Sequence, residues 1–364
     1  MKIVIIANTI FPHNQPRAFR ATELAKEFAE RNHEVVLISN LGNYDYEEFT
    51  AKHPIKIKNL GPNLFYKQVS NGEWKYNFVT KVLSKLFYKR ILFPEIELAY
   101  RTCQALIKEK NVDLLITLAP SHAIHWGAAF FKSRFPNKFS GVWIADCGDP
   151  FSGNQSAKYA KYLKRVENWA FKFANYITVP TDDSISGYSS VHHHKIRVIP
   201  QGFKFTKNDI KSIEPNEVPY FVYGGIFYKE IRDPRPFLDY ILSLDIDFLF
   251  RIYTNKDSFI KDYIGIDKRL DIVDFVSREQ FLEQLEKADF AVNFANKGSV
   301  QTPSKLIDYA IKGTPILQAN FGIVDQKLIL EFLEGNYSNG YKITDIDQYK
   351  IENVVNKFLS TAFE

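Results

Sequence analysis

The stretch Thr302-Pro303-Ser304-Lys305-Leu306-Ile307-Asp308-Tyr309-Ala310-Ile311-Lys312-Gly313-Thr314-Pro315-Ile316 has a start and a stop signal for one helix. Ser304 or Thr302 can cap its first turn, which Pro303 also suits. Gly313 fits the position just past its last turn, and Pro315 prevents continuation. The pattern predicts a short helix over residues 303–312.

This predicted helix follows an apolar strand, Phe290–Phe294, after a short polar loop. In open parallel sheets, ligands bind at the carboxyl ends of the strands, and the free N–H groups of a helix N-terminus favour phosphate. Asp308 lies about one turn into the helix, within reach of ribose hydroxyls. We therefore expect a nucleotide site here.

The rest of the chain alternates strands and helices. Lys2–Ala7, Arg17–Arg31 and Glu34–Ser39 form a strand–helix–strand unit, which implies a parallel sheet. Further strands are predicted at residues 112–118, 141–145, 176–180, 195–199, 220–225, 248–253, 270–273 and 315–318, with helices at 76–92, 97–110, 121–135, 159–173, 236–244, 278–286, 325–334 and 347–363. The polar segment 206–219 is expected to link two α/β domains.

Composition excludes several classes of protein. The 364 residues are 45% hydrophobic and 24% charged, as in ordinary globular enzymes. Two cysteines cannot build a disulfide scaffold or a Cys-rich zinc module. We find no export signal and no run of about 20 apolar residues, so we expect a cytoplasmic protein. The glycine fingerprints of dinucleotide enzymes and P-loop hydrolases are missing.

Positive charge is concentrated in one segment. Residues 1–200 hold 27 Lys and Arg against 17 Asp and Glu, whereas residues 201–364 hold 20 against 25. Residues 51–95 carry nine basic residues and two acidic ones, interleaved with aromatic side chains. Two interpretations stay open, a solvated helix face and an anionic membrane surface. No nucleic-acid motif is present, so we expect no nucleic-acid partner.

PSKLIDYAIKGTPIL (303–317) resembles the helix motif of GT-B glycosyltransferases, especially family 4. The resemblance implies two Rossmann-like domains facing across a cleft. These would be an acceptor-side domain over 1–203 and a nucleotide-sugar domain over 204–345, with a helix in 346–364 packing back toward the first domain. It also implies that Asp308 contacts the ribose and that Ser304, Lys305 and Leu306 line the phosphates. Val300 stands where the family often has a glutamate near the sugar.

Other segments follow the family's order. Tyr223-Gly224-Gly225-Ile226 resembles its glycine–basic segment, which implies that Gly225, Lys229 and Arg232 contact the donor diphosphate. Ile226 replaces the usual arginine, so we assign that role to Arg232, as a catalytic cation, and to Lys229. By order alone, Val276 falls where relatives hold the base through main-chain groups. Residues 199–202 (IPQG) resemble the family's turn at the domain junction.

The first domain offers acceptor-side candidates. In Trp143–Pro150 (WIADCGDP), which resembles a strand-end segment of related enzymes, Asp146 and Asp149 are both expected to face the ligand. Asp149 is either a catalytic positioning residue or the cap of the next turn. His122 and His125 open the helix after strand 112–118, and His122 is the better catalytic candidate.

The loop after the first strand supplies the remaining candidates. His13, Arg17 and Arg20 lie in or just after it and are assigned to an anionic acceptor, such as the phosphates of a lipid-linked sugar. His192-His193-His194 is interpreted as a polar loop, since consecutive histidines point in different directions. We therefore expect no metal site.

The implied reaction is transfer of a sugar from a nucleotide-sugar to an acceptor hydroxyl, with retention of configuration and without a metal or other cofactor. We expect a glycan or lipid-linked glycan acceptor in bacterial surface polysaccharide synthesis, and a cytoplasmic enzyme. Peripheral binding to the inner face of the membrane stays open as one of the two interpretations of residues 51–95. Two alternatives stay open. One is a nucleotide-sugar 2-epimerase of the same fold, and the other is a non-catalytic nucleotide- or glycan-binding relative.

Overall fold

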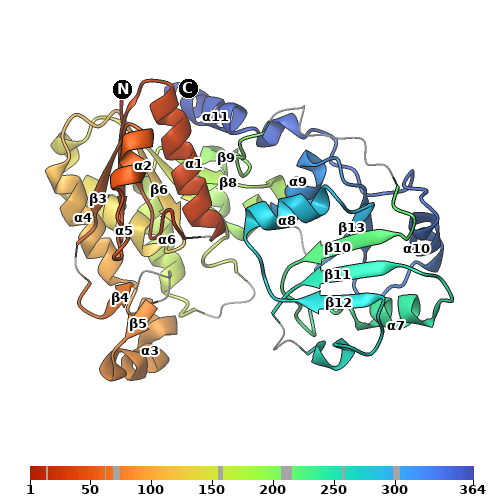
Figure 1. Ribbon diagram of the computed structural model, residues 1–364. Coiled ribbons are helices and arrows are strands. Elements are labelled where there is room, and N and C mark those ends of the chain that lie inside the picture. Colours follow the sequence, from red (N-terminus) through yellow and green to blue (C-terminus); the bar gives the residue numbers. More distant parts are fainter. Residues whose placement is uncertain are drawn as a thin grey trace. The chain divides into compact units, whose positions relative to one another are not determined.

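The computed structural model describes residues 1–364 apart from 14, 62, 69–73, 155–158, 206–214, 256–258 and 298–303. It divides into two compact units. Unit 1 comprises Met1–Lys204 and Gln348–Glu364, and unit 2 comprises Phe205–Asp347. Each unit is built on a parallel sheet with helices packed against it (Figure 1). The predicted α/β fold class is therefore confirmed.

The sheet of unit 1 has the strand order β3-β2-β1-β6-β7-β8-β9, and every neighbouring pair is parallel. Its strands are β1 (Lys2–Ile6), β2 (Glu34–Ser39), β3 (Ile55–Asn59), β6 (Leu114–Ala119), β7 (Val142–Cys147), β8 (Tyr176–Val179) and β9 (Ile196–Val198). The helices are α1 (Pro16–Glu30), α2 (Glu47–Lys52), α4 (Glu97–Lys108), α5 (Ala123–Arg134), α6 (Leu163–Phe173) and α11 (Ile351–Phe363).

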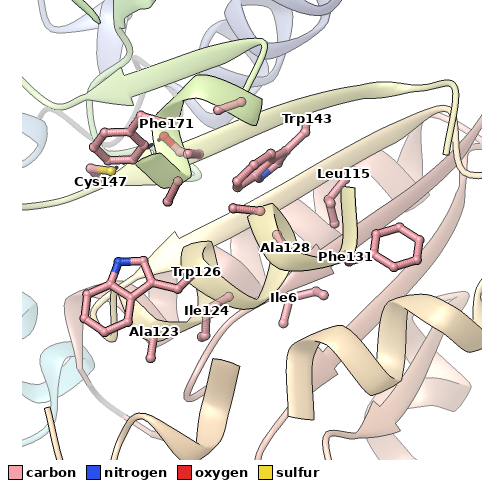
Figure 2. Close-up of a cluster of buried hydrophobic side chains, with 14 of the residues drawn as sticks. Ile6, Leu115, Ala123, Ile124, Trp126, Ala128, Phe131, Trp143, Cys147 and Phe171 are labelled. Atoms are coloured by element: carbon pink, nitrogen blue, oxygen red, sulfur yellow. Dashed lines mark hydrogen bonds between the residues drawn. The ribbon is translucent and has the colours of Figure 1, made fainter. Parts of the chain in front are cut away.

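Alternation along the strands gives unit 1 two apolar layers. Val4 and Ile6 face the layer that α5 and α6 cover, which contains Trp126, Trp143 and Phe171 (Figure 2). Ile3 and Ile5 face the opposite layer, beneath α1 and α11. Successive side chains of a strand point to opposite faces, so the near-continuous apolar runs of these strands fit a sheet covered on both sides.

Helix α11 belongs to unit 1 although the chain of unit 2 precedes it. Its buried residues Val354, Val355 and Phe358 pack in the layer beneath α1. Arg31 fixes the two helices together by donating to the Asn356 Oδ1 atom (2.6 Å) and to the Glu352 carbonyl (2.8 Å).

A small appendage interrupts the α/β pattern of unit 1. Strands β4 (Tyr66–Gln68) and β5 (Trp74–Tyr76) pair antiparallel with each other, outside the main sheet, and helix α3 (Phe78–Ile91) follows (Figure 1). The helix matches the prediction over 76–92. Strands β3 to β5 and helix α2 were not predicted.

Unit 2 carries a parallel sheet in the order β12-β11-β10-β13-β14. Its strands are β10 (Tyr220–Gly224), β11 (Leu249–Tyr253), β12 (Leu270–Val273), β13 (Phe290–Phe294) and β14 (Ile316–Ala319). Its helices are α7 (Arg235–Ser243), α8 (Arg278–Leu285), α9 (Ser304–Ile311) and α10 (Gln326–Leu333). A stack of Phe221 on Phe250 and Phe290, with centroids 4.5 Å apart, fills one layer. Most of the predicted linker, residues 206–214, lies outside the described residues.

Candidate functional site

In unit 2, polar groups gather where β10 and β13 end and α9 begins. The central strands of the sheet deliver Gly224 and Gly225 to the same edge at which Lys305 starts the first turn of α9. Helix N-termini at the carboxyl edge of a parallel sheet present unpaired N–H groups. This edge is the candidate donor site.

Lys305 is the most unusual group of this edge. Its Nζ atom is buried and has no hydrogen-bond partner within the described parts of the chain. It lies 4.0 Å from the centroid of the Tyr223 ring. Burial, and then the nearby positive charge of Arg232, hold the pKa of Lys305 well below its ordinary value. A buried cation without a carboxylate is costly unless a ligand supplies the missing negative charge.

Arg232 is held beside Lys305 by three contacts. Its Nε atom donates to the Asn296 Oδ1 atom (2.9 Å), and its Nη1 atom donates to the Ile226 carbonyl (3.2 Å) and the Tyr223 hydroxyl (3.4 Å). The half-buried guanidinium is thus oriented without a carboxylate partner among the described residues. Its Nη2 atom makes no hydrogen bond with them, so it can donate to a ligand.

Gly225 is required by the close packing of this edge. Its φ is +152°, and a Cβ atom there would lie 2.8 Å from the Tyr223 hydroxyl and 3.5 Å from the Lys305 Nζ atom. Any other residue would be strained and would collide with the tyrosine. Gly225 thereby allows the main chain to approach both Tyr223 and Lys305.

Asp308 lies one turn into α9 and forms an ion pair that the sequence did not reveal. Arg278, the first residue of α8, donates from Nε to the Asp308 Oδ1 atom (3.1 Å). Burial raises the pKa of Asp308, and the positive charge of Arg278 opposes this. In the sequence, Ser277 and Arg278 can be recognised only as the start of a helix. That pattern does not reveal that the side chain of Arg278 binds Asp308, 30 residues further along the chain.

The other predicted donor residues occupy varied positions. Lys229 and Val276 are exposed in loops, whereas the Leu306 side chain is buried among core residues, so only its main chain is at the helix N-terminus. Ser304 begins α9. Val300, Thr302 and Pro303 lie outside the described residues.

The sheet of unit 1 has a buried ion-pair network at the carboxyl ends of its strands. The network is centred on Asp146, near the end of β7. Arg20 donates from Nε and Nη2 to the two carboxylate oxygens, both at 2.8 Å. Arg17 forms a second ion pair with Asp146, and the Thr178 hydroxyl donates at 2.6 Å. Burial alone would raise the pKa of Asp146, but the two guanidinium groups hold it well below its ordinary range.

This network corrects two expectations. Arg20 is 2% exposed and also donates to the carbonyls of Ile199 (3.1 Å) and Pro200 (2.5 Å), so it ties α1 to the turn after β9 and does not meet an acceptor. Asp146, expected to face a ligand, is 1% exposed and neutralised internally. Arg17 is directed inward as well, because it donates to the Ala119 carbonyl (2.6 Å) in addition to Asp146.

His122 and Asp149 do lie together at this edge. Asp149 is exposed just after β7, and its main chain is hydrogen-bonded to the His122 ring. Burial lowers the pKa of His122 to about 4, so the ring is neutral near pH 7. His13 lies half-buried in the loop after β1, where burial lowers its pKa.

Glu95 is a further candidate, and nothing in the sequence pattern indicates it. Its carboxyl group is hydrogen-bonded to Ser121, which follows β6 and directly precedes His122, and burial raises the pKa of Glu95. Glu95 comes directly after Pro94 in the segment that joins α3 to α4, which has no strand or helix pattern to place it at the sheet edge. Its position close to His122 becomes visible only in the structure.

Among the described residues, His122, His125 and Cys147 are the potential metal-ligating group, with ligand atoms within 4.8 Å of one another. His125 is already bonded internally. Its Nδ1 atom pairs with the Thr117 hydroxyl at 2.7 Å, and its Nε2 atom pairs with the Cys147 sulfur at 3.4 Å. These contacts form a hydrogen-bond network that needs no metal ion. That the reaction is metal-independent stays a prediction.

No protein-family model matches the sequence, and a comparison with curated proteins finds no match. Solved structures, in contrast, match over the whole chain. The apo form of the lipopolysaccharide outer core galactosyltransferase WaaB is 14% identical, with a TM-score of 0.58, over 100% of this chain and 99% of its own. Anabaena HepE in complex with UDP is 11% identical, with a TM-score of 0.60, over 100% and 96%.

A third similar structure is a putative UDP-N-acetylglucosamine 2-epimerase from Listeria monocytogenes, 10% identical with a TM-score of 0.55, over 99% of this chain and 95% of its own. Together these matches show that the chain has the GT-B fold.

Proposed function

We propose that this GT-B chain is a glycosyltransferase that moves a sugar from a nucleoside-diphosphate sugar to an acceptor hydroxyl. One observation carries the proposal: the buried side-chain amine of Lys305, which has no hydrogen-bond partner in the described part of the chain, lies beside Arg232 at the N-terminus of α9. Two basic side chains without a carboxylate partner among the described residues favour a doubly charged anion, and a nucleoside diphosphate is one.

The chemistry follows from this arrangement. When the glycosidic bond to the diphosphate breaks, negative charge grows on the leaving phosphate oxygen. Lys305, the Nη2 atom of Arg232 and the first N–H groups of α9 are positioned to stabilise that charge. Because Asn296 and Tyr223 hold Arg232 in place, little reorganisation is required during the reaction. Arg232 is in this proposal the catalytic cation.

The nucleoside end of the donor would lie toward α8. The Asp308 carboxylate would accept hydrogen bonds from the ribose hydroxyls. Its ion pair with Arg278 keeps the carboxylate charged although burial raises the pKa of Asp308. The exposed loop at Val276, between β12 and α8, is the proposed base-binding segment. HepE was crystallised with UDP, and we therefore propose UDP as the first nucleotide to test.

On the acceptor side, we propose Asp149 and His122 as residues that position the acceptor hydroxyl. His122 is neutral near pH 7, so it can donate or accept a hydrogen bond without adding charge. We further propose transfer with retention of configuration and without a metal. In this mechanism the departing phosphate accepts the acceptor proton, and no dedicated protein base is needed.

We propose a glycan or lipid-linked glycan as the acceptor, in synthesis of a bacterial surface polysaccharide at the inner face of the cytoplasmic membrane. The likeness to WaaB, a galactosyltransferase of the lipopolysaccharide outer core, and the basic segment 51–95 support this setting. Within the described residues, no helix has the length and apolar character needed to cross a bilayer.

Calorimetry with UDP, GDP, ADP and CMP tests the donor site. We expect one nucleoside diphosphate to bind, and Lys305→Ala and Arg232→Ala each to weaken it by roughly 10- to 100-fold, the range for hydrogen bonds to charged groups. Lys268→Ala is the matched control, because this exposed lysine precedes β12 at the opposite edge of the same sheet. Equal binding by all four proteins, or no binding, would contradict the proposal.

A 2-epimerase is the second candidate, favoured by the likeness to the Listeria structure. The two activities differ in their need for an acceptor. An epimerase would convert the nucleotide-sugar alone, whereas a transferase would release the nucleoside diphosphate only when an acceptor is present, apart from slow hydrolysis. Donor binding without turnover under either condition would indicate a non-catalytic relative.

A further inference from the structure

Helix α3 leaves an apolar face without a partner among the described residues. Phe78 is 81% exposed and Leu86 is 59% exposed, and Val79 and Val82 are exposed as well. Phe78, Val82 and Leu86 recur every four residues, so they lie on one side of the helix. Single exposed apolar side chains are common on protein surfaces, but a continuous row marks an interaction surface.

The apolar face of α3 points outward because the opposite side of the helix is fixed to the rest of unit 1. Thr80 is its one buried residue, and the C-terminal half of the helix is fixed to the loop before α6. There the Ala160 N–H donates to the Lys89 carbonyl (2.8 Å), and the Tyr88 and Tyr159 hydroxyls are 3.3 Å apart. The helix is therefore anchored by one side and one end, beside β4 and β5 (Figure 1).

A row of cations runs beside the apolar row. Lys81, Lys85 and Lys89 recur at the same four-residue spacing, and Arg90 adds a further charge. All four are exposed, and no acidic residue occurs between Trp74 and Pro94. Long basic side chains can bury their methylene groups along a lipid surface while the charged ends reach the headgroups.

We propose that α3 docks on an anionic lipid surface, with its axis in the plane of the interface and Phe78, Val82 and Leu86 directed into the acyl boundary. The occupant is a membrane and not a second copy of this chain, because a self-complementary contact would place these cations opposite one another. This deepens the membrane setting of the proposed function by naming the element that docks, and it requires nothing of the donor site.

Vesicle flotation of the full chain tests this surface, with phosphatidylcholine vesicles and with vesicles that also contain phosphatidylglycerol. We expect binding to the anionic vesicles that weakens as salt increases. Reversing three charges, in Lys81→Glu/Lys85→Glu/Lys89→Glu, should lower the partition coefficient by about 100-fold or more. Lys108→Glu/Lys110→Glu/Lys138→Glu is the control, because it reverses three exposed lysines of unit 1 outside α3.

The apolar face has its own variant, Phe78→Ser/Leu86→Ser, which should weaken binding about tenfold or more and leave its salt dependence in place. Both side chains are exposed, so the melting temperature should not change. Phe78→Trp should show a blue-shifted emission with anionic vesicles only. Nucleotide calorimetry on the same variants reports separately on the donor site, so failure of docking and failure of the transferase proposal are distinguishable.

Four results would overturn the inference. Wild-type protein could bind neither kind of vesicle. The α3 variants could bind as strongly as the control variant. Alternatively, sedimentation could reveal a dimer that Phe78→Ser/Leu86→Ser dissociates, or an oligonucleotide could compete for the same lysines while vesicles do not.

Discussion

The Nζ atom of Lys305 lies 4.0 Å from the centroid of the Tyr223 ring, and it is buried there without a hydrogen-bond partner in the described residues. A cation–π contact offsets part of the cost of burying an ammonium group, but not all of it. In the free protein the charged form of Lys305 is therefore disfavoured, and an anionic ligand would stabilise it.

Lys305→Met should stabilise the unliganded protein and weaken nucleotide binding by roughly 10- to 100-fold, as Lys305→Ala does. Removing a buried, uncompensated polar group is expected to raise the free energy of unfolding by about 1–2 kcal/mol. The melting temperature would rise by roughly 2–4 °C for each kcal/mol if unit 2 unfolds on its own. Scanning calorimetry with and without UDP measures both effects. A variant that is less stable than wild type and binds UDP as tightly as wild type would contradict this assignment.

The lowered pKa of Lys305 also predicts proton uptake on binding. In the folded protein the amine loses its proton at a lower pH than in the unfolded chain, so stability should rise with pH below the ordinary lysine pKa of 10.5. A bound diphosphate restores the charged form. Calorimetry of nucleotide binding in buffers of different ionisation enthalpy, repeated at several pH values below 10.5, should therefore show net proton uptake in part of that range. Buffer-independent heats would argue against it.

Asp146→Asn should destabilise unit 1 strongly. It removes the negative charge with which both Arg17 and Arg20 are paired, and breaking one side of a buried ion pair costs about 3–5 kcal/mol. Urea unfolding followed by circular dichroism measures the loss. Asp149→Asn, three residues further on and exposed, is the control and should stay within about 0.5 kcal/mol of wild type.

Gly225→Ala separates crowding from backbone strain. The new Cβ atom would meet the Tyr223 hydroxyl at 2.8 Å, in addition to adopting a φ of +152°. Gly265 is the matched control, because it also has a positive φ, +76°, but no atom lies within 4 Å of the point that its Cβ atom would occupy. We expect Gly225→Ala to cost about 1–3 kcal/mol more than Gly265→Ala in urea unfolding. Equal losses would show that the packing around Tyr223 can relax.

His122 should contribute to acid sensitivity. Its folded-state pKa of about 4 is below its ordinary value of 6.5, so the unfolded chain binds a proton that the folded chain does not between these values. Stability is therefore lost as the pH falls from about 6.5 to 4, by up to about 3 kcal/mol from this residue. His122→Gln should flatten that part of the pH profile. An unchanged profile would mean that the ring is accessible to solvent in the folded protein.

The strands and helices of both units were largely predictable because their signals are local. Val35–Ser39 is a nearly uninterrupted apolar run, and α9 has a proline before it and Gly313 after it. Strand β3 was missed although the alternation of isoleucine and lysine in Ile55–Lys58 is a strand signal, because the run is short and lies at one edge of the sheet.

The partners of charged site residues were not predictable. Arg20 and Asp146 are separated by 126 residues, and Arg278 and Asp308 by 30. A basic residue near a predicted ligand edge has the same appearance in the sequence whether it binds a ligand or an internal carboxylate. For this reason Arg20 was expected to meet the acceptor, whereas the fold uses it to connect α1, β7 and the turn after β9.

The packing of α11 against α1 has a consequence for the order of synthesis. Unit 1 needs Val354, Val355 and Phe358 to close one of its two apolar layers, but the ribosome reaches them only after it has made all of unit 2. During translation, part of the apolar sheet face under α1 therefore stays uncovered until residues 205–347 have been made. This uncovered apolar surface is a binding site for chaperones on the nascent chain. Unit 2 is the first part of this protein whose residues are all available for folding.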